Sequence, residues 1–280
     1  MLQRFVWSIK FDNITHDHLC GDFSMIPLRD DIPSRTTPVI NYLVIGLCAL
    51  AFLAQKASSD QSEGIVSGFA MVPLRLTDPD ATPVMQHRVA VQTPRGVEIQ
   101  EIRQEIGPSA VPAWATLITC MFLHGGWMHF LDNMWFLYIF GDNVEDRLGH
   151  FGYALLYIGT GVLAGLAHLL SDPASPVPTL GASGAIAGVM GAYAFLYPHA
   201  RVLAVLPLMF VFPTFVLPGP VFLGIWFVIQ LVNSLGSLAG GEAGGVAWWA
   251  HAGGFIAGAV AALLIGRSPL GHEAIKERRF

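Results

Sequence analysis

Charged residues are scarce in this chain. Only 12% of the 280 residues are charged and 53% are hydrophobic, whereas a soluble domain carries about 25% charged residues. The three cysteines, Cys20, Cys48 and Cys120, are too few and too scattered for a disulfide framework or a zinc cluster. The net charge of −5 includes no basic block, so we expect no nucleic-acid partner. The composition therefore predicts a membrane protein whose surroundings are the lipid bilayer.

Long apolar stretches are abundant instead. A membrane span needs about 20 mainly apolar residues. The sequence predicts six spans, at about 38–55, 126–142, 151–170, 183–197, 220–235 and 248–266. The fourth and sixth are short and rich in glycine, which suits helices buried among other helices. We therefore predict an all-α polytopic membrane protein with a bundle of six transmembrane helices.

Positive charge is distributed unevenly along the tails and short loops. In the tails and short loops, the Lys and Arg residues lie in 1–37, at Arg147, at Arg201 and in 267–280. The loops 171–182 and 236–247 contain none. Positive residues stay on the cytoplasmic side of a membrane, so we expect both termini in the cytoplasm, which agrees with an even number of spans. The predicted organisation is a cytoplasmic tail 1–37, a membrane domain 38–266 and a cytoplasmic tail 267–280, in a bacterial cytoplasmic (inner) membrane.

Three segments lack a clear helical pattern. The stretch 56–113 is a long loop on the outer side that mixes polar residues with short apolar runs, and it indicates no particular function. The apolar stretch 201–220 contains four prolines, which favours a re-entrant or extended passage over a helix. The first 24 residues show no pattern, and we hypothesise that translation starts at Met25, which N-terminal sequencing would test.

Polar residues inside spans are costly and often functional, and one of them is Ser183. This serine lies in Gly181-Ala182-Ser183-Gly184, at the start of the fourth span. At a helix N-terminus, free N–H groups and the helix dipole favour developing negative charge, as attack of a serine on a carbonyl requires. By itself the motif also fits an N-cap or a helix-packing serine. The serine therefore predicts catalysis only together with a base.

His251 is the candidate base. It lies near the outer start of the sixth span, and Gly254 and Gly258 follow it on the same helix face. Gly184 and Gly188 form a matching face on the fourth span, and such pairs let two backbones approach closely. If these helices pack together, imidazole and hydroxyl come within hydrogen-bond reach. We favour a Ser–His dyad, oriented by packing because no acidic partner is evident, over a histidine that only packs.

His129 and Asn133 share one face of the second span. An acyl transfer needs donors aimed at the oxyanion, and these side chains could supply them together with the Ser183 backbone N–H. The alternative role is hydrogen bonding between helices. His124 lies in the turn before this span, where we expect it to bond the backbone and hold the loop.

In this order the motifs resemble those of rhomboid proteases. The matching residues are His124, His129 and Asn133, then Gly181 to Gly184, then Ala250, His251, Gly254 and Gly258. The resemblance covers about 38–266 and includes the turn Glu145-Asp146-Arg147-Leu148-Gly149. It implies a six-helix core, a Ser183–His251 dyad, and an oxyanion hole made by His129, Asn133 and the Ser183 amide. It further implies cleavage of transmembrane protein substrates near the outer membrane surface, without a cofactor or metal.

Two positions depart from the family pattern. Many members carry an aromatic ring one turn after the serine that stacks on the histidine, whereas this chain has Ala187. Another side chain must therefore orient His251, and Trp248 and Trp249 are candidates. Many members also have Arg after a Trp in the first loop, whereas Trp114 is followed here by Ala115.

Other functions compete with the protease. A cysteine enzyme would use Cys120 and His124, and a zinc site would use His124, His129 and His251, although the HExxH signature is absent. A catalytically inactive rhomboid-like protein would bind client transmembrane helices, but usually lacks the serine or the histidine. A small transporter would show repeated halves or ionisable groups near the midplane, and neither is evident. The sequence does not indicate an oligomeric state.

Overall fold

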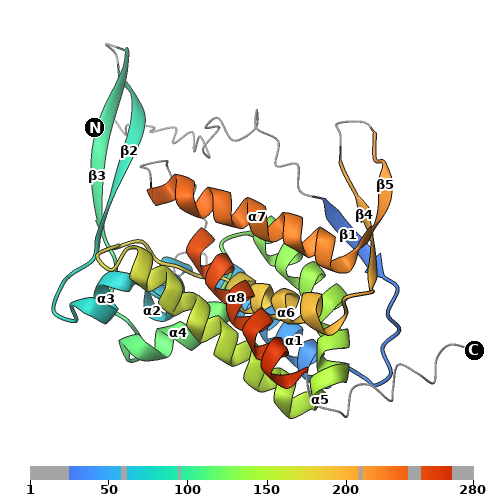
Figure 1. The fold of residues 1–280 in the computed structure, drawn as a ribbon. Helices are drawn as coiled ribbons and strands as arrows, with labels where there is room; N and C mark the ends of the chain where they lie inside the picture. Colours follow the sequence, from blue (N-terminus) through green and yellow to red (C-terminus); the bar gives the residue numbers. More distant parts are fainter. Residues whose placement is uncertain (1–24, 58–61, 94–95, 208–210, 239–246, 267–280) are drawn as a thin grey trace, which may run out of the picture.

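The computed structural model describes residues 25–57, 62–93, 96–207, 211–238 and 247–266. Helices predominate in this part of the chain (Figure 1). They are α1 (Val39–Ala57), α2 (Ser62–Phe69), α3 (Pro73–Thr77), α4 (Thr116–Thr119), α5 (Trp127–Ser171), α6 (Ser183–Leu196), α7 (Gly219–Leu238) and α8 (Trp248–Ile265). The strands are β1 (Ile26–Asp30), β2 (Val84–Thr93), β3 (Gly96–Glu105), β4 (Arg201–Val205) and β5 (Thr214–Pro218). Both predicted tails beyond these ranges lie outside the described residues.

The apolar helices follow the predicted spans with one difference. By length and composition, α1, α5 and α8 can each cross a membrane, while α6 and the apolar part of α7 are shorter. The predicted second and third spans form one element, α5, in which Gly149 has φ 71° and ψ 165° and interrupts the helical backbone. Glycine adopts this left-handed region without steric cost. The described residues therefore hold three helices of full spanning length, and the six-span count stays a prediction.

The all-α prediction is incomplete because two sheets are present. β4 pairs antiparallel with β1 and with β5, which gives the strand order β1-β4-β5. The stretch 201–220 is thus largely a β-hairpin, in keeping with the extended passage that its prolines favour. The sequence predicts only a cytoplasmic tail for 1–37, yet residues 26–30 form an edge strand of this sheet. Asp30 anchors that strand by accepting hydrogen bonds from Tyr193 on α6 and Asn143 on α5.

The outer loop 56–113 is also structured where it is described. β2 and β3 form a ten-residue antiparallel ladder that projects from the helices (Figure 1). Below it, the buried Arg75 guanidinium donates hydrogen bonds to the carbonyls of Ser67 and Gly107. A buried guanidinium needs such acceptors, so Arg75 ties α3 to both ends of the loop.

The turn within α5 fastens the start of α1. Glu145 accepts hydrogen bonds from the backbone N–H groups of Ile40 (2.9 Å) and Asn41 (2.7 Å), while Asp146 accepts from Thr36 (2.9 Å to the backbone nitrogen). The first N–H groups of a helix have no intrahelical acceptor, and a carboxylate there also interacts favourably with the helix dipole. Glu145 therefore caps α1 from a distant part of the chain, and Asp146 holds the segment just before it.

Helix α6 lies at the centre of the helices, against α5 and α8 (Figure 1). Its contact with α8 is made of backbone. A Cβ atom on Gly258 would lie 1.8 Å from the carbonyl oxygen of Gly188, and one on Gly254 would lie 2.0 Å from that of Gly184. On the other side, Gly188 packs against Thr160 of α5. The glycine faces of the fourth and sixth predicted spans thus meet directly and fix the distance between α6 and α8.

Candidate active site

The close contact of α6 and α8 brings Ser183 and His251 together. Ser183 is the first residue of α6 and His251 lies in the first turn of α8. Their Oγ and Nε2 atoms are 2.7 Å apart. Gly184 and Gly254, the neighbours of these two residues in the packed faces, leave no room for a side chain between the helices. The pair has the separation that proton transfer from a serine to an imidazole requires.

His251 has a partner on its other ring nitrogen that the sequence analysis missed. Nδ1 lies 2.7 Å from Oε1 of Gln230, on α7. The expectation that packing rather than a carboxylate orients the histidine is therefore incomplete, because an amide oxygen also binds the ring. Gln230, Asn233 and Ser234 are the polar side chains of the predicted span 220–235, and Gln230 was the available signal, since a polar residue in a span needs a partner.

Aromatic rings also surround the imidazole. Trp226 of α7 lies with its ring 5.9 Å from that of His251 at an angle of 37°, and Trp248 meets it edge-on at 6.0 Å. Trp248 was one of the two predicted candidates, whereas Trp226 was not considered and no ring contact joins Trp249 to His251 among the described residues. Ala187 is completely buried. The rings that pack on His251 thus come from α7 and α8.

The polar side chains of α5 face the loop before Ser183. The Gly125 N–H donates to Nδ1 of His129 (3.4 Å), which leaves Nε2 of that ring to carry a proton. This nitrogen lies close to Gly181, where a Cβ atom would be only 2.8 Å from it and where φ is +131°. Glycine at 181 therefore allows an unusual backbone conformation and leaves room for the ring of His129.

Asn133 is buried, with 6% of its surface exposed. Its Nδ2 has no hydrogen-bond partner among the described residues. A buried amide donor left unpaired costs about 1–3 kcal/mol, and such groups in native structures often have a role in catalysis or ligand binding. Asn133 thus offers a free donor one helical turn from His129.

His124 holds its turn by its backbone. Its N–H donates to Oε1 of Gln55 (3.1 Å) and its carbonyl accepts from Nε2 of the same side chain (3.2 Å). The ring packs between Phe52, His129 and Phe130. Neither ring nitrogen of His124 has a hydrogen-bond partner among the described residues, so the expectation that its side chain bonds the backbone is wrong. The ring contributes by packing, and Gln55 supplies the hydrogen bonds that hold the turn.

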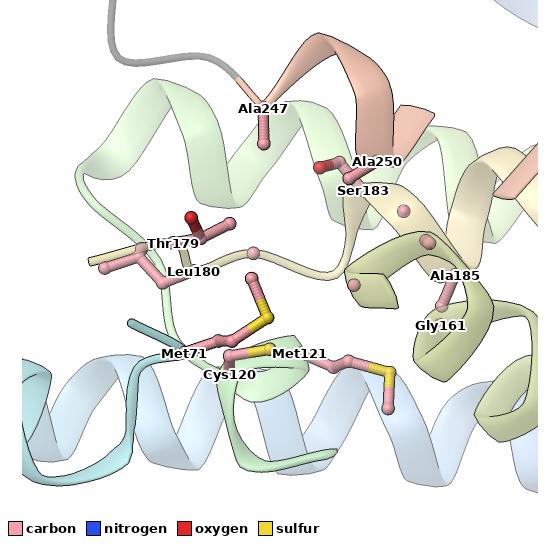
Figure 2. Close-up of a pocket in the computed structure, with 14 residues that line it drawn as sticks. Met71, Cys120, Met121, Gly161, Thr179, Leu180, Ser183, Ala185, Ala247 and Ala250 are labelled. Carbon is pink, nitrogen blue, oxygen red and sulfur yellow. The ribbon is translucent and has the colours of Figure 1, made fainter. Parts of the chain in front are cut away.

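A cavity of about 30 Å³ adjoins Ser183. Figure 2 shows Ser183 and Ala250 on one side of it and Met71, Cys120 and Met121 on another. This volume holds about one or two water molecules. Its walls are largely apolar, so the serine faces a small, mainly apolar space.

Two observations bear on the rival cysteine and zinc sites. Burial raises the pKa of the Cys120 thiol to about 12, so the thiolate that a cysteine nucleophile requires is not formed near neutral pH. Within the described ranges, no three His, Cys, Asp or Glu side chains form a group that could hold a metal ion.

Comparison with known proteins shows which family the chain resembles. The family model of the Rhomboid domain matches residues 112–268, which is more than half of the chain. The chain is 46% identical to Rhomboid-like protein 11, chloroplastic, of Arabidopsis thaliana over 78 residues, which are 28% of each protein. It is 34% identical to Rhomboid protein 1, mitochondrial, of Saccharomyces cerevisiae over 153 residues, 51% of this chain and 39% of the yeast protein.

A third relative bears a protease name. Rhomboid protease GluP of Bacillus subtilis is 35% identical over 83 residues, which are 30% of this chain and 16% of GluP. The matched segments cover less than half of each of these relatives. With the family model spanning the segment from the first loop through α8, the chain belongs to the rhomboid family of membrane proteins.

Proposed function

We propose that this chain is an intramembrane serine endopeptidase in which Ser183 is the nucleophile and His251 the general base. The observation that carries the proposal is the 2.7 Å hydrogen bond between Ser183 Oγ and His251 Nε2. A serine hydroxyl is a weak nucleophile unless an adjacent base accepts its proton during attack. Both residues lie on helices whose backbones are in contact, so their separation is fixed by rigid elements.

The reaction follows from this geometry. Ser183 Oγ attacks the carbonyl carbon of the scissile peptide bond while His251 Nε2 takes the hydroxyl proton. His251 then donates that proton to the leaving amine, which departs and leaves an acyl-enzyme. Water enters, His251 accepts one of its protons, and hydrolysis regenerates the free serine. The cavity beside Ser183 has room for such a water.

The oxyanion of the tetrahedral intermediate is assigned to three donors. These are the Ser183 backbone N–H, Nε2–H of His129 and Nδ2–H of Asn133. The unpaired, buried amide of Asn133 supports the assignment, because a preorganised donor requires no reorganisation when charge develops.

Replacement of Asn133 tests this assignment. We expect Asn133→Ala to lower kcat by about 10²–10³, the usual effect of losing one oxyanion donor, with little change in KM. Steady-state cleavage of a membrane substrate measures it. Asn133→Asp is the matched comparison, since it keeps the size of the side chain but offers no N–H when ionised. Unchanged kcat in both variants would remove Asn133 from the site.

The proposed substrates are transmembrane segments of membrane proteins. Ser183 and His251 both lie at the first turn of an apolar helix, so they share one level of the helix bundle. The charge distribution predicts that this level is near the outer surface, with six spans and both termini in the cytoplasm. Relatives carry chloroplast and mitochondrial names, and the bacterial inner membrane remains our prediction for this chain.

Labelling with a fluorophosphonate or isocoumarin-type probe tests the proposed function. Such probes react with an activated serine, so the full chain in membranes should form an adduct at Ser183, identified by peptide mass spectrometry. The Ser183→Ala variant is the control. An unlabelled but folded wild-type chain that still binds transmembrane helices would instead support a catalytically inactive rhomboid-like protein.

A further inference from the structure

Gln230 is a polar residue whose place in α7 needs an explanation. Only 7% of its surface is exposed, whereas Val228 and Val232 on the same helix are 55% and 61% exposed. Helix α7 therefore turns its amide inward and its valines outward. Burial of an amide is unfavourable unless it is hydrogen-bonded, and Oε1 of Gln230 lies 2.7 Å from Nδ1 of His251.

The contact with Gln230 determines which ring nitrogen of the neutral His251 imidazole carries the proton. Such a ring carries one proton, on either Nδ1 or Nε2. An amide oxygen accepts a hydrogen bond but cannot donate one, so Oε1 of Gln230 favours the tautomer with the proton on Nδ1. Nε2 then presents its lone pair to Ser183 Oγ, 2.7 Å away. The opposite tautomer would direct an N–H at the serine and could not accept its proton.

We propose that Gln230 is a positioning residue that completes a Ser183–His251–Gln230 triad, an inference that rests on the proposed function of the first two. It holds the imidazole in the tautomer and orientation that act as a base. When Nε2 takes the serine proton, the Nδ1–H to Oε1 hydrogen bond persists and is strengthened by the charge on the ring.

The triad draws on three helices. Ser183 and His251 belong to α6 and α8, whose backbones touch through glycines. Gln230 and Trp226 reach the histidine from α7, one through a hydrogen bond and the other through its ring. This pair supplies from α7 the contacts to His251 that Ala187 on α6, which has no aromatic ring, cannot make.

The size of the effect follows from the chemistry. Loss of the buried aspartate of a Ser–His–Asp triad lowers kcat by about 10⁴. A neutral amide orients the ring equally well but stabilises the imidazolium less, because it has no net charge. We therefore expect loss of the Gln230 acceptor to lower kcat by about 10- to 100-fold, with KM nearly unchanged.

The test uses the full chain in lipid, with two variants of nearly equal size. Gln230→Leu removes the acceptor, and Gln230→Glu retains a carboxyl oxygen at the same position. We expect Gln230→Leu to lose kcat and Gln230→Glu to restore most of it, with the acid limb of its pH–rate profile moved to higher pH because a nearby negative charge favours the imidazolium. His129 and His168, the other titratable groups that act on His251, are unchanged in both variants. Val228→Ala on the outward face is the matched control.

Two measurements decide the outcome. Imidazole ¹⁵N chemical shifts of the Ser183→Ala protein, with and without Gln230→Leu, report which nitrogen carries the proton, and we expect the Nδ1–H form to predominate only when Gln230 is present. Equal kcat and equal pH profiles for the wild type, Gln230→Leu and Gln230→Glu would overturn the inference while leaving the dyad intact. Full activity of Ser183→Ala would instead overturn the proposed function itself.

Discussion

Ser183→Ala should abolish cleavage of a model transmembrane substrate. Removal of the nucleophile from a serine protease lowers kcat by about 10⁶, which brings the rate below detection for an intramembrane enzyme. The loss is expected without unfolding, because the hydroxyl forms its hydrogen bond with His251 and the remaining contacts of α6 are made by other residues. Cleavage is measured in liposomes, and thermal unfolding of the same samples reports the fold.

Replacement of His251 tests whether the two residues act as one catalytic unit. His251→Ala should lose as much activity as Ser183→Ala, because residues that act as one unit each cost about as much as the whole unit when removed. Substantial turnover by His251→Ala would mean that Ser183 does not depend on this base, and detectable turnover by Ser183→Ala would refute the proposed nucleophile.

Among glycine-to-alanine substitutions in the described helices, Gly258→Ala should cause the largest loss of activity and stability. The added Cβ would lie 1.8 Å from the Gly188 carbonyl oxygen, in a contact made only of backbone. The backbone cannot yield as a side chain would, so α8 must move away from α6. Displacements of about 1 Å at reacting groups cost about 10² in rate, and overpacking costs about 1–3 kcal/mol of stability. We expect at least a 100-fold loss of cleavage together with a lower Tm.

Gly159→Ala supplies the matched control. This glycine is also helical, on α5, and a Cβ placed on it meets nothing within 4 Å. The same chemical change should therefore leave activity unchanged and the stability equal or slightly higher, since Ala favours helix over Gly. If Gly258→Ala behaved like Gly159→Ala, the close α6–α8 contact would not set the distance between Ser183 and His251.

Helix periodicity decides which side chains share a face, and the predicted contact between two glycine faces is present in the structure. The spacing of Gly254 and Gly258, and of Gly184 and Gly188, indicated two narrow faces, and in the structure these faces touch. The proximity of Ser183 and His251 is a direct consequence of that contact. His129 and Asn133, four residues apart, likewise had to share a face.

Other features could not be read from local patterns. The strand β1 forms because residues 26–30 pair with a hairpin some 170 residues later, and nothing in its own sequence announces that partner. The sequence predicts two separate spans on either side of Gly149, whereas the structure has one element, α5, interrupted at that glycine. A glycine in the sequence does not show whether the chain bends at one residue or forms a longer loop. Gln55 was overlooked although it is the residue that fastens the turn at His124.

The amino-acid sequence by itself determined that this is an apolar, mainly helical protein of the rhomboid type with a serine and a histidine at the starts of two glycine-lined helices. Composition, spacing and helical period are properties of the chain alone, so they can be read without coordinates. Only the tertiary structure placed Gln230 and Trp226 of α7 against the ring of His251. A side chain's hydrogen-bond partner depends on how separate helices pack, and that distance and rotation are set by the sum of all their contacts rather than by any one segment.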